Sequence, residues 1–181
     1  MTTAKTFAKS LFFLIGLLVL TAGFTNAQTS APAQKTAEPA VLDTTKHSVK
    51  IPAGWRHFDK ATGEFTALYI MAPRVNNFSP NVNIIMAETG NISMDEFLNG
   101  NMDNMKKNNM APDTSGDFET NGMKGKFYST KIDHNGVSIT IKTYMLLKGG
   151  LGYVLTGACL TAQRTDYYPL FDDIVKSFKI K

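Results

Sequence analysis

The sequence lacks several features on which whole protein classes depend. Its 181 residues include one cysteine, Cys159, which excludes a disulfide-stapled scaffold and a cysteine-ligated zinc ribbon, because each needs at least two thiols. Its three histidines, His47, His57 and His134, show no HxxxH or HExxH spacing. Apolar and aromatic residues are not scarce, and at 43% and 10% they exclude an intrinsically disordered chain.

The longest apolar run lies at the N-terminus and is too short to cross a bilayer. Lys5 and Lys9 precede the uncharged stretch 11–24, and small or polar residues follow it. This order is typical of a secretory signal peptide, whereas a membrane span needs about 20 apolar residues. We therefore predict cleavage after Ala27 and export to the periplasm or the medium, with an uncleaved membrane anchor as the alternative.

The chain that remains after cleavage has little excess charge. Cleavage removes two lysines and no acidic residue, so the formal net charge falls from +4 to +2. Nucleic-acid binding requires a concentrated basic face, and this balance excludes that class of partner. We also expect no membrane span once the signal peptide is gone.

Composition divides the mature chain into two parts. Residues 28–45 are rich in alanine, proline and threonine and contain no aromatic residue, which predicts a flexible tether. Residues 46–181 contain regularly spaced apolar positions and predict a single globular domain. A domain of this size buries a core of its own without help from disulfides.

Periodicity and turn signals set the expected order of elements in this domain. Alternating apolar residues predict early strands at 47–51 and 81–87, and the segment 65–72, which is apolar on both faces, predicts a central strand between them. A capping box formed by Ser93 and Glu96 begins the first helix, and the second helix is expected from about residue 166 to 178. Between the two helices, tight hairpin turns are predicted at Asn121-Gly122, Asn135-Gly136 and Gly149-Gly150.

These elements together predict an α+β fold. The expected order is βββ-α-ββββ-α, because four predicted strands separate the two helices. Hairpins between successive strands make a mostly antiparallel sheet of about six to seven strands, and both amphipathic helices must bury their apolar stripes against it.

Three segments of the predicted domain carry a family resemblance: the strand closed by an aromatic residue, Ser48–Trp55, the strand Gly152–Ala158, and the ending Tyr168–Phe178. Together they resemble the PsbP/DcrB-like family of exported bacterial and plastid proteins over about residues 46–181. The resemblance implies an antiparallel sheet with packed helices and a role without catalysis, as an accessory subunit, chaperone-like binder or envelope protein. No functional motif of the family is matched, so the resemblance assigns no site residue.

Methionines are the best candidate metal ligands. Met94, Met102, Met105 and Met110 lie in one segment, and thioether sulfurs bind Cu(I) in exported proteins. The first three share a helical face with Phe97, however, which favours ordinary core packing. We therefore predict no bound cofactor and keep a copper or small-ligand carrier using segment 94–110 as the alternative function.

The residues indicate no catalytic constellation. There is no G-x-S-x-G nucleophile elbow, and Cys159 alternates with Leu155 on a predicted strand, which indicates a buried thiol. Gly149–Gly152 joins two predicted strands, so a hairpin explains it better than a phosphate-binding loop. A hydrolase whose site assembles from His57 or His134 is the least favoured hypothesis.

Binding is the function that the sequence favours. Two predicted turns, one after the first strand and one between the second and third, hold polar and aromatic residues of the kind that carry recognition. Trp55 equally suits a core anchor. The leading hypothesis is an exported, non-catalytic binding or accessory protein of the bacterial cell envelope that docks a protein partner. The candidate partner-binding residues are Trp55, Arg56, His57, Arg74, Asn77 and Phe78.

Overall fold

The fold is built on antiparallel pairs of strands, most of which are neighbours in the chain. A computed structural model describes residues 34–181 except 36–37, 63–64, 109 and 135. The predicted signal peptide and the first part of the predicted tether lie outside the described residues.

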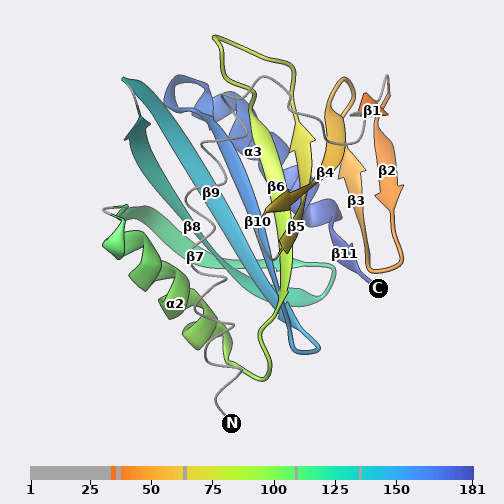
Figure 1. The fold of residues 1–181 in the computed structure, drawn as a ribbon, viewed down its shortest axis with the longest axis vertical. Helices are drawn as coiled ribbons and strands as arrows, with labels where there is room; N and C mark the ends of the chain where they lie inside the picture. The colour runs from red at the N-terminus through yellow and green to blue at the C-terminus, as the bar shows by residue number, and fades with distance from the viewer. Residues whose placement is uncertain (1–33, 36–37, 63–64, 109, 135) are drawn as a thin grey trace.

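The larger sheet has eight antiparallel strands in the order β1-β4-β5-β6-β10-β9-β8-β7 (Figure 1). Strand β10 lies between β6 and β9, and nearly all its side chains are buried, as expected of a strand covered on both faces. The strands are β1 (Gln34–Lys35), β4 (Arg56–Thr62), β5 (Phe65–Met71), β6 (Asn81–Glu88), β7 (Pro112–Thr120), β8 (Met123–His134), β9 (Val137–Lys148) and β10 (Leu151–Leu160).

A smaller sheet and two helices cover the larger sheet. The smaller sheet has the order β11-β3-β2, with β2 at Ala40–Asp43, β3 at His47–Ile51 and β11 at Lys179–Ile180. Helices α2 (Met94–Lys107) and α3 (Arg164–Ser177) lie on opposite faces of the larger sheet (Figure 1). The core therefore has two main parts, one shared by the sheet with β3 and α3 and the other shared with α2, and a smaller third cluster around Phe78.

Two of the three predicted turns and the predicted helix start are confirmed, whereas Asn135 of the third turn lies outside the described residues. Asn121 and Gly122 both have positive φ, 48° and 76°, as a type I′ hairpin requires, and Gly149 and Gly150 do likewise. The side chains and backbone N–H groups of Ser93 and Glu96 cap one another at the start of α2. Within the described residues, neither helix is long and apolar enough to span a membrane.

Two expectations about the first part of the chain are wrong. Part of the predicted flexible tether is paired, because β2 is hydrogen-bonded to β3 and β1 is paired with β4. The chain after Trp55 continues as strand β4 instead of turning. Neither β2 nor β4 carries a clear sequence signal: β2 is short, and β4, with the sequence RHFDKAT, is too rich in charged residues to alternate clearly. The short strands β1 and β11 were also not predicted.

Helix α3 lies unusually close to the sheet at Gly157 of β10. A Cβ atom built on Gly157 would lie 2.5 Å from Cδ2 of Phe171, which is fully buried. Phe171, Ile174 and Val175 are the buried residues of α3. The helix packs directly on the backbone of β10 because Gly157 has no side chain at the point of contact.

A partly buried charge pair ties the same helix to β9. The Lys142 ammonium donates to Asp172 Oδ1 at 2.7 Å and lies 5.0 Å from the centre of the Phe127 ring. The Tyr144 hydroxyl donates to the same carboxylate. Burial, followed by the Asp172 hydrogen bond, raises the pKa of Tyr144 above its usual range, so this hydroxyl keeps its proton as a donor.

We predict that Gly157→Ala destabilises the protein by about 1–3 kcal/mol, because the new methyl group overlaps the Phe171 ring. Urea unfolding measures the change. The double variant Gly157→Ala/Phe171→Leu is expected to cost less than the sum of its single changes, since the smaller side chain makes room. Simple additivity would show that the close contact is not the cause.

We predict that Asp172→Ala costs about 2 kcal/mol, because it leaves the Lys142 charge and the Tyr144 hydroxyl without their shared acceptor. The matched control is Asp103→Ala, which removes an exposed partner of Lys106 on α2 and is expected to change the free energy of unfolding by less than about 0.5 kcal/mol. Equal losses of unfolding free energy in the two variants would show that the shared acceptor at Asp172 does not stabilise the fold.

Candidate functional site

The six predicted partner-binding residues do not form one surface. Trp55 is 5% exposed and packs near Tyr167, with 6.3 Å between ring centroids. Phe78 is fully buried in a small cluster with Ile139 and Ile141. Both aromatic residues are therefore core anchors. For Trp55, the sequence allowed this interpretation beside the docking one.

Three of the other residues are exposed at one end of the larger sheet: Arg56, Arg74 and Asn77, which we name the arginine end. Arg56 begins β4 and pairs with Met71, the last residue of β5, and Arg74 follows shortly after Met71. The loop between β5 and β6 therefore extends beyond the same end of the sheet as Arg56 (Figure 1).

The backbone of the arginine end is fixed by a tight turn. Val75 and Phe78 exchange backbone hydrogen bonds of 2.8 and 3.0 Å, and the two residues between them, Asn76 and Asn77, have φ of 48° and 62°. This is a type I′ turn, in which asparagine tolerates the positive φ. Because Phe78 is buried, the turn holds the backbone of Asn77 in a defined position.

Arg56 and His57 point to opposite faces of the sheet, as successive strand residues do. The Arg56 guanidinium lies 5.8 Å from the centre of the Phe58 ring, and its Nη2 atom lies 3.8 Å from Met71 Sδ. His57 instead faces the smaller sheet, together with Asp59, two residues further along β4.

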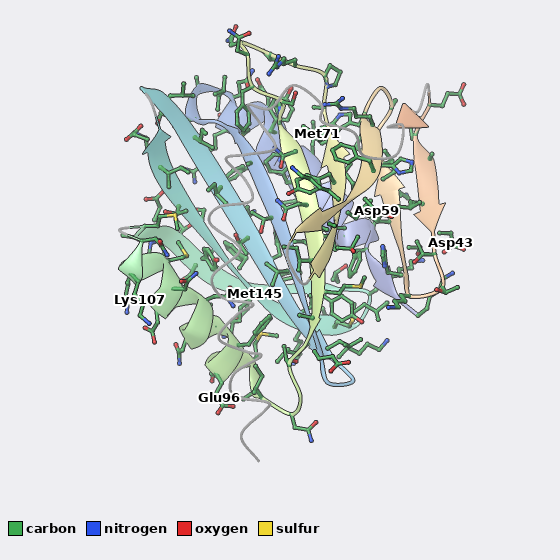
Figure 2. The ribbon with its side chains drawn as sticks, in the orientation of Figure 1. Asp43, Asp59, Met71, Glu96, Lys107 and Met145 are labelled. Atoms are coloured by element: carbon green, nitrogen blue, oxygen red, sulfur yellow. The ribbon has the colours of Figure 1, made fainter. Side chains whose placement is uncertain are left out.

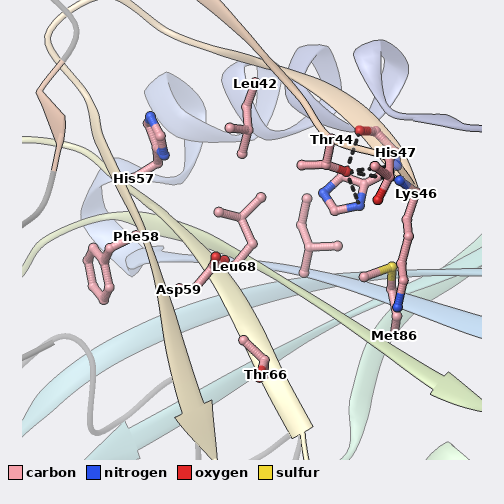
Figure 3. Close-up of a pocket in the computed structure, with 12 residues that line it drawn as sticks. Leu42, Thr44, Lys46, His47, His57, Phe58, Asp59, Thr66, Leu68 and Met86 are labelled. Carbon is pink, nitrogen blue, oxygen red and sulfur yellow. Dashed lines mark hydrogen bonds between the residues drawn. The ribbon is translucent and has the colours of Figure 1, made fainter. Parts of the chain in front are cut away.

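His57 and Asp59 line a cleft of about 400 Å³, which we name the His47 cleft. The cleft lies between β4 and the connection from β2 to β3, and side chains of β5 and β6 form its floor (Figure 3). The floor is mostly apolar, whereas the walls carry polar groups. The lining residues with apolar side chains include Leu42, Leu68, Ile84 and Met86, and those with polar side chains include Thr44, Lys46, His47, His57, Asp59 and Thr66.

His47 is the buried polar residue of the cleft. Its side chain is 6% exposed, and its ring lies 5.5 Å from the ring of Phe178. Thr44 closes the turn before it, with its hydroxyl 2.8 Å from the His47 carbonyl oxygen and 3.4 Å from ring Nδ1. The other ring nitrogen, Nε2, is buried and has no hydrogen-bond partner among the described residues.

The surroundings favour the neutral form of the His47 ring. Burial is the largest influence and lowers the pKa below the usual 6.5. The Asp59 carboxylate opposes this shift, while the positive charges of Lys181 and Lys46 add to it. At neutral pH the cleft therefore contains an uncharged imidazole between charges of both signs.

The methionine segment lies in the core. Met105 is buried, and Met94, Met102 and Met110 pack against the same cluster, which includes Phe97 and Met145. In Figure 2 the labelled Met145 lies between α2 and the strands behind it. This packing favours the core interpretation of these methionines over the copper alternative. Nowhere in the described part of the chain do three His, Cys, Asp or Glu side chains gather as metal ligands would.

The candidate nucleophile and acid-base groups lie apart. Cys159 is fully buried, and burial raises the pKa of its thiol to about 12, which makes it inert as a nucleophile. His57 lines the cleft, whereas the side chain of His134 lies outside what the structure describes. Sequence reasoning missed His47, Thr44 and Asp59; the His57-x-Asp59 alternation was the one signal that two polar groups share a face.

Comparison with known proteins supports the fold. No protein-family model matches the sequence, and no curated protein matches it. Among solved structures, LpqN of Mycobacterium tuberculosis, described as involved in cell envelope biogenesis, has a TM-score of 0.58 at 16% identity over 87% of this chain and 90% of LpqN.

Two further structures show the same arrangement. Cyanobacterial PsbP from Synechocystis has a TM-score of 0.57 at 11% identity and covers 86% of this chain and 98% of its own. A Pseudomonas aeruginosa protein of unknown function has a TM-score of 0.57 at 10% identity, covering 77% of this chain and 95% of its own. The TM-scores establish a PsbP-like fold, as the sequence resemblance implied. At identities this low, the likeness shows the fold alone.

We predict that the protein loses stability as pH falls below about 6.5, because the unfolded chain then binds a proton at His47 that the folded ring accepts only at lower pH. The free energy of unfolding, measured by urea at pH 7.5 and 5.5, should fall less in His47→Phe than in the unchanged protein. Asp59→Asn should steepen the fall, because it removes the charge that opposes the shift. If the free energy of unfolding fell as much between pH 7.5 and 5.5 in His47→Phe as in the unchanged protein, His47 would not be the cause of the pH dependence.

Proposed function

We propose that this protein is an exported, non-catalytic binding or accessory protein of the bacterial cell envelope, and that it docks a protein partner through the arginine end. The observation that carries the proposal is the placement of Arg56, Arg74 and Asn77. All three are exposed at one end of the sheet, on a strand and a tight turn that buried residues hold in place.

Rigid presentation of arginines favours recognition. Arginine is enriched at protein interfaces because its planar guanidinium donates several hydrogen bonds and stacks on flat groups. Arg56 begins β4, and Arg74 lies between the end of β5 and the turn that Phe78 anchors. Fixing both backbones in advance lowers the entropy that is lost when a partner binds.

The compartment and the absence of catalysis are part of the proposal. Export is supported by the predicted signal peptide in residues 1–27. An envelope role is supported by the shared fold with LpqN, whose description places it in cell envelope biogenesis. The raised thiol pKa of the buried Cys159 supports a role other than thiol catalysis.

Capture from the envelope of the native host tests the docking surface. An affinity tag is inserted directly after Ala27, because the C-terminal residues are part of the smaller sheet. We expect one envelope protein to be recovered near one-to-one by quantitative mass spectrometry. Arg56→Glu/Arg74→Glu should reduce its recovery by at least about tenfold, since interface arginines often contribute 1–2 kcal/mol or more each.

The matched control reverses the same number of charges elsewhere. Lys106 and Lys107 are exposed at the end of α2, and Figure 2 shows Lys107 far from Met71 and the arginine end. Lys106→Glu/Lys107→Glu should leave the recovery unchanged, with both double variants still folded at the temperature of the capture. Loss of the partner in the lysine variant alone, or recovery of no envelope protein near one-to-one, would overturn the proposal.

A further inference from the structure

The His47 cleft contains a buried hydrogen-bonding atom that the fold itself does not satisfy. Nε2 of His47 lies in a side chain that is 6% exposed, and it has no partner among the described residues. Figure 3 shows the ring directed into the cleft, with the nitrogen that contacts Thr44 on the side away from Leu68. Buried polar atoms are nearly always hydrogen-bonded in folded proteins, so an exception that faces a cavity points to a ligand.

The hydrogen bonds of Thr44 leave the ring hydrogen of His47 unassigned. The Thr44 hydroxyl donates to the His47 carbonyl oxygen at 2.8 Å and accepts the backbone N–H groups of Lys46 and His47 at 3.2 and 3.0 Å, so both of its lone pairs are used. The neutral ring therefore carries its hydrogen on either nitrogen. A ligand that donates a hydrogen bond to Nε2 selects the form with the hydrogen on Nδ1.

The rest of the cleft adds an apolar body and a negative charge to this requirement. Leu68 and Ile84 are buried beneath it and present aliphatic surface. The Asp59 carboxylate stands on the β4 wall of the same cleft as the His47 ring, so it attracts a positively charged end of a bound ligand. A volume of about 400 Å³ is in the range of small-molecule pockets.

We propose that the His47 cleft binds a small amphipathic molecule whose polar end, a primary amine or a hydroxyl, donates a hydrogen bond to Nε2 of His47 while its aliphatic part lies on Leu68 and Ile84. An ammonium end gains an additional attraction from Asp59. This site is separate from the arginine end, because His57 and Asp59 face one side of β4 and Arg56 faces the other.

Three probes of equal chain length separate the possible chemistries: hexylamine, hexanol and hexanoate. They are titrated into the mature protein at neutral pH, with NMR detection of the methyl groups of Leu68 and Ile84 and of the ring nitrogens of His47. We expect saturable binding of the amine and the alcohol, and binding of hexanoate weaker by at least about tenfold, since an ionised carboxylate has no hydrogen to donate and is repelled by Asp59 in the same cleft. The Nε2 resonance should shift on binding.

Two substitutions test the roles of the polar groups. His47→Phe keeps an aromatic ring beside Phe178 but removes the acceptor, and should weaken the amine and the alcohol alike by about tenfold. Asp59→Asn, at an exposed position, should remove the preference for the amine over the alcohol. Asp173→Asn on α3 is the charge-matched control and should bind all three probes as the parent protein does.

The outcomes separate this site from the proposed docking function. Arg56→Glu/Arg74→Glu should keep full probe binding, so a failure of partner docking leaves this inference intact, and the reverse also holds. Absence of saturable binding, hexanoate binding as tight as that of hexylamine, or an Nε2 resonance that does not move when a probe binds would each overturn it. The NMR measurement on the unchanged protein decides the matter even if His47→Phe does not fold.

Discussion

The close approach of helix α3 to strand β10 at Gly157 is the constraint on which the rest of the structure depends. With no Cβ at that position, the Phe171 ring lies directly on the backbone of the central strand. The position of α3 in turn determines where the C-terminal residues lie: Phe178 packs against Tyr153 and His47, and β11 pairs with β3. The smaller sheet, and with it one wall of the His47 cleft, is placed by this contact.

Much of the fold could be predicted because its long elements carry local signals. Strands β8 and β9 alternate apolar and polar residues over much of their length, β10 is apolar on both faces, and the turns between them contain Asn-Gly or Gly-Gly pairs. The start of α2 was evident from Ser93 and Glu96. What could not be predicted were β1, β2, β4 and β11, because short or charged strands form only where a partner strand, often distant in sequence, is already in place.

The candidate sites were predictable only where burial follows from residue type. An aromatic residue in a turn suits both a core and a docking surface, and for Trp55 and Phe78 packing with distant residues decided in favour of the core. Arg56, Arg74 and Asn77 are exposed as a loop assignment predicts, although Arg56 lies on a strand. The His47 cleft was missed because its walls and floor come from five strands and a connection that meet only in the folded chain.

If the chain is exported as proposed, the pairing of β3 with β11 has a consequence for how it reaches its folded state. The Lys50 N–H donates to Ser177 Oγ, a contact between residues 127 positions apart, and the Lys181 N–H donates to the Lys46 carbonyl oxygen. A chain that is translocated N-terminus first delivers His47 early and its neighbours Phe178 and Ile180 last. Contacts of such long sequence separation slow folding, so the wall that holds His47 is expected to assemble late, after translocation has released the final strand.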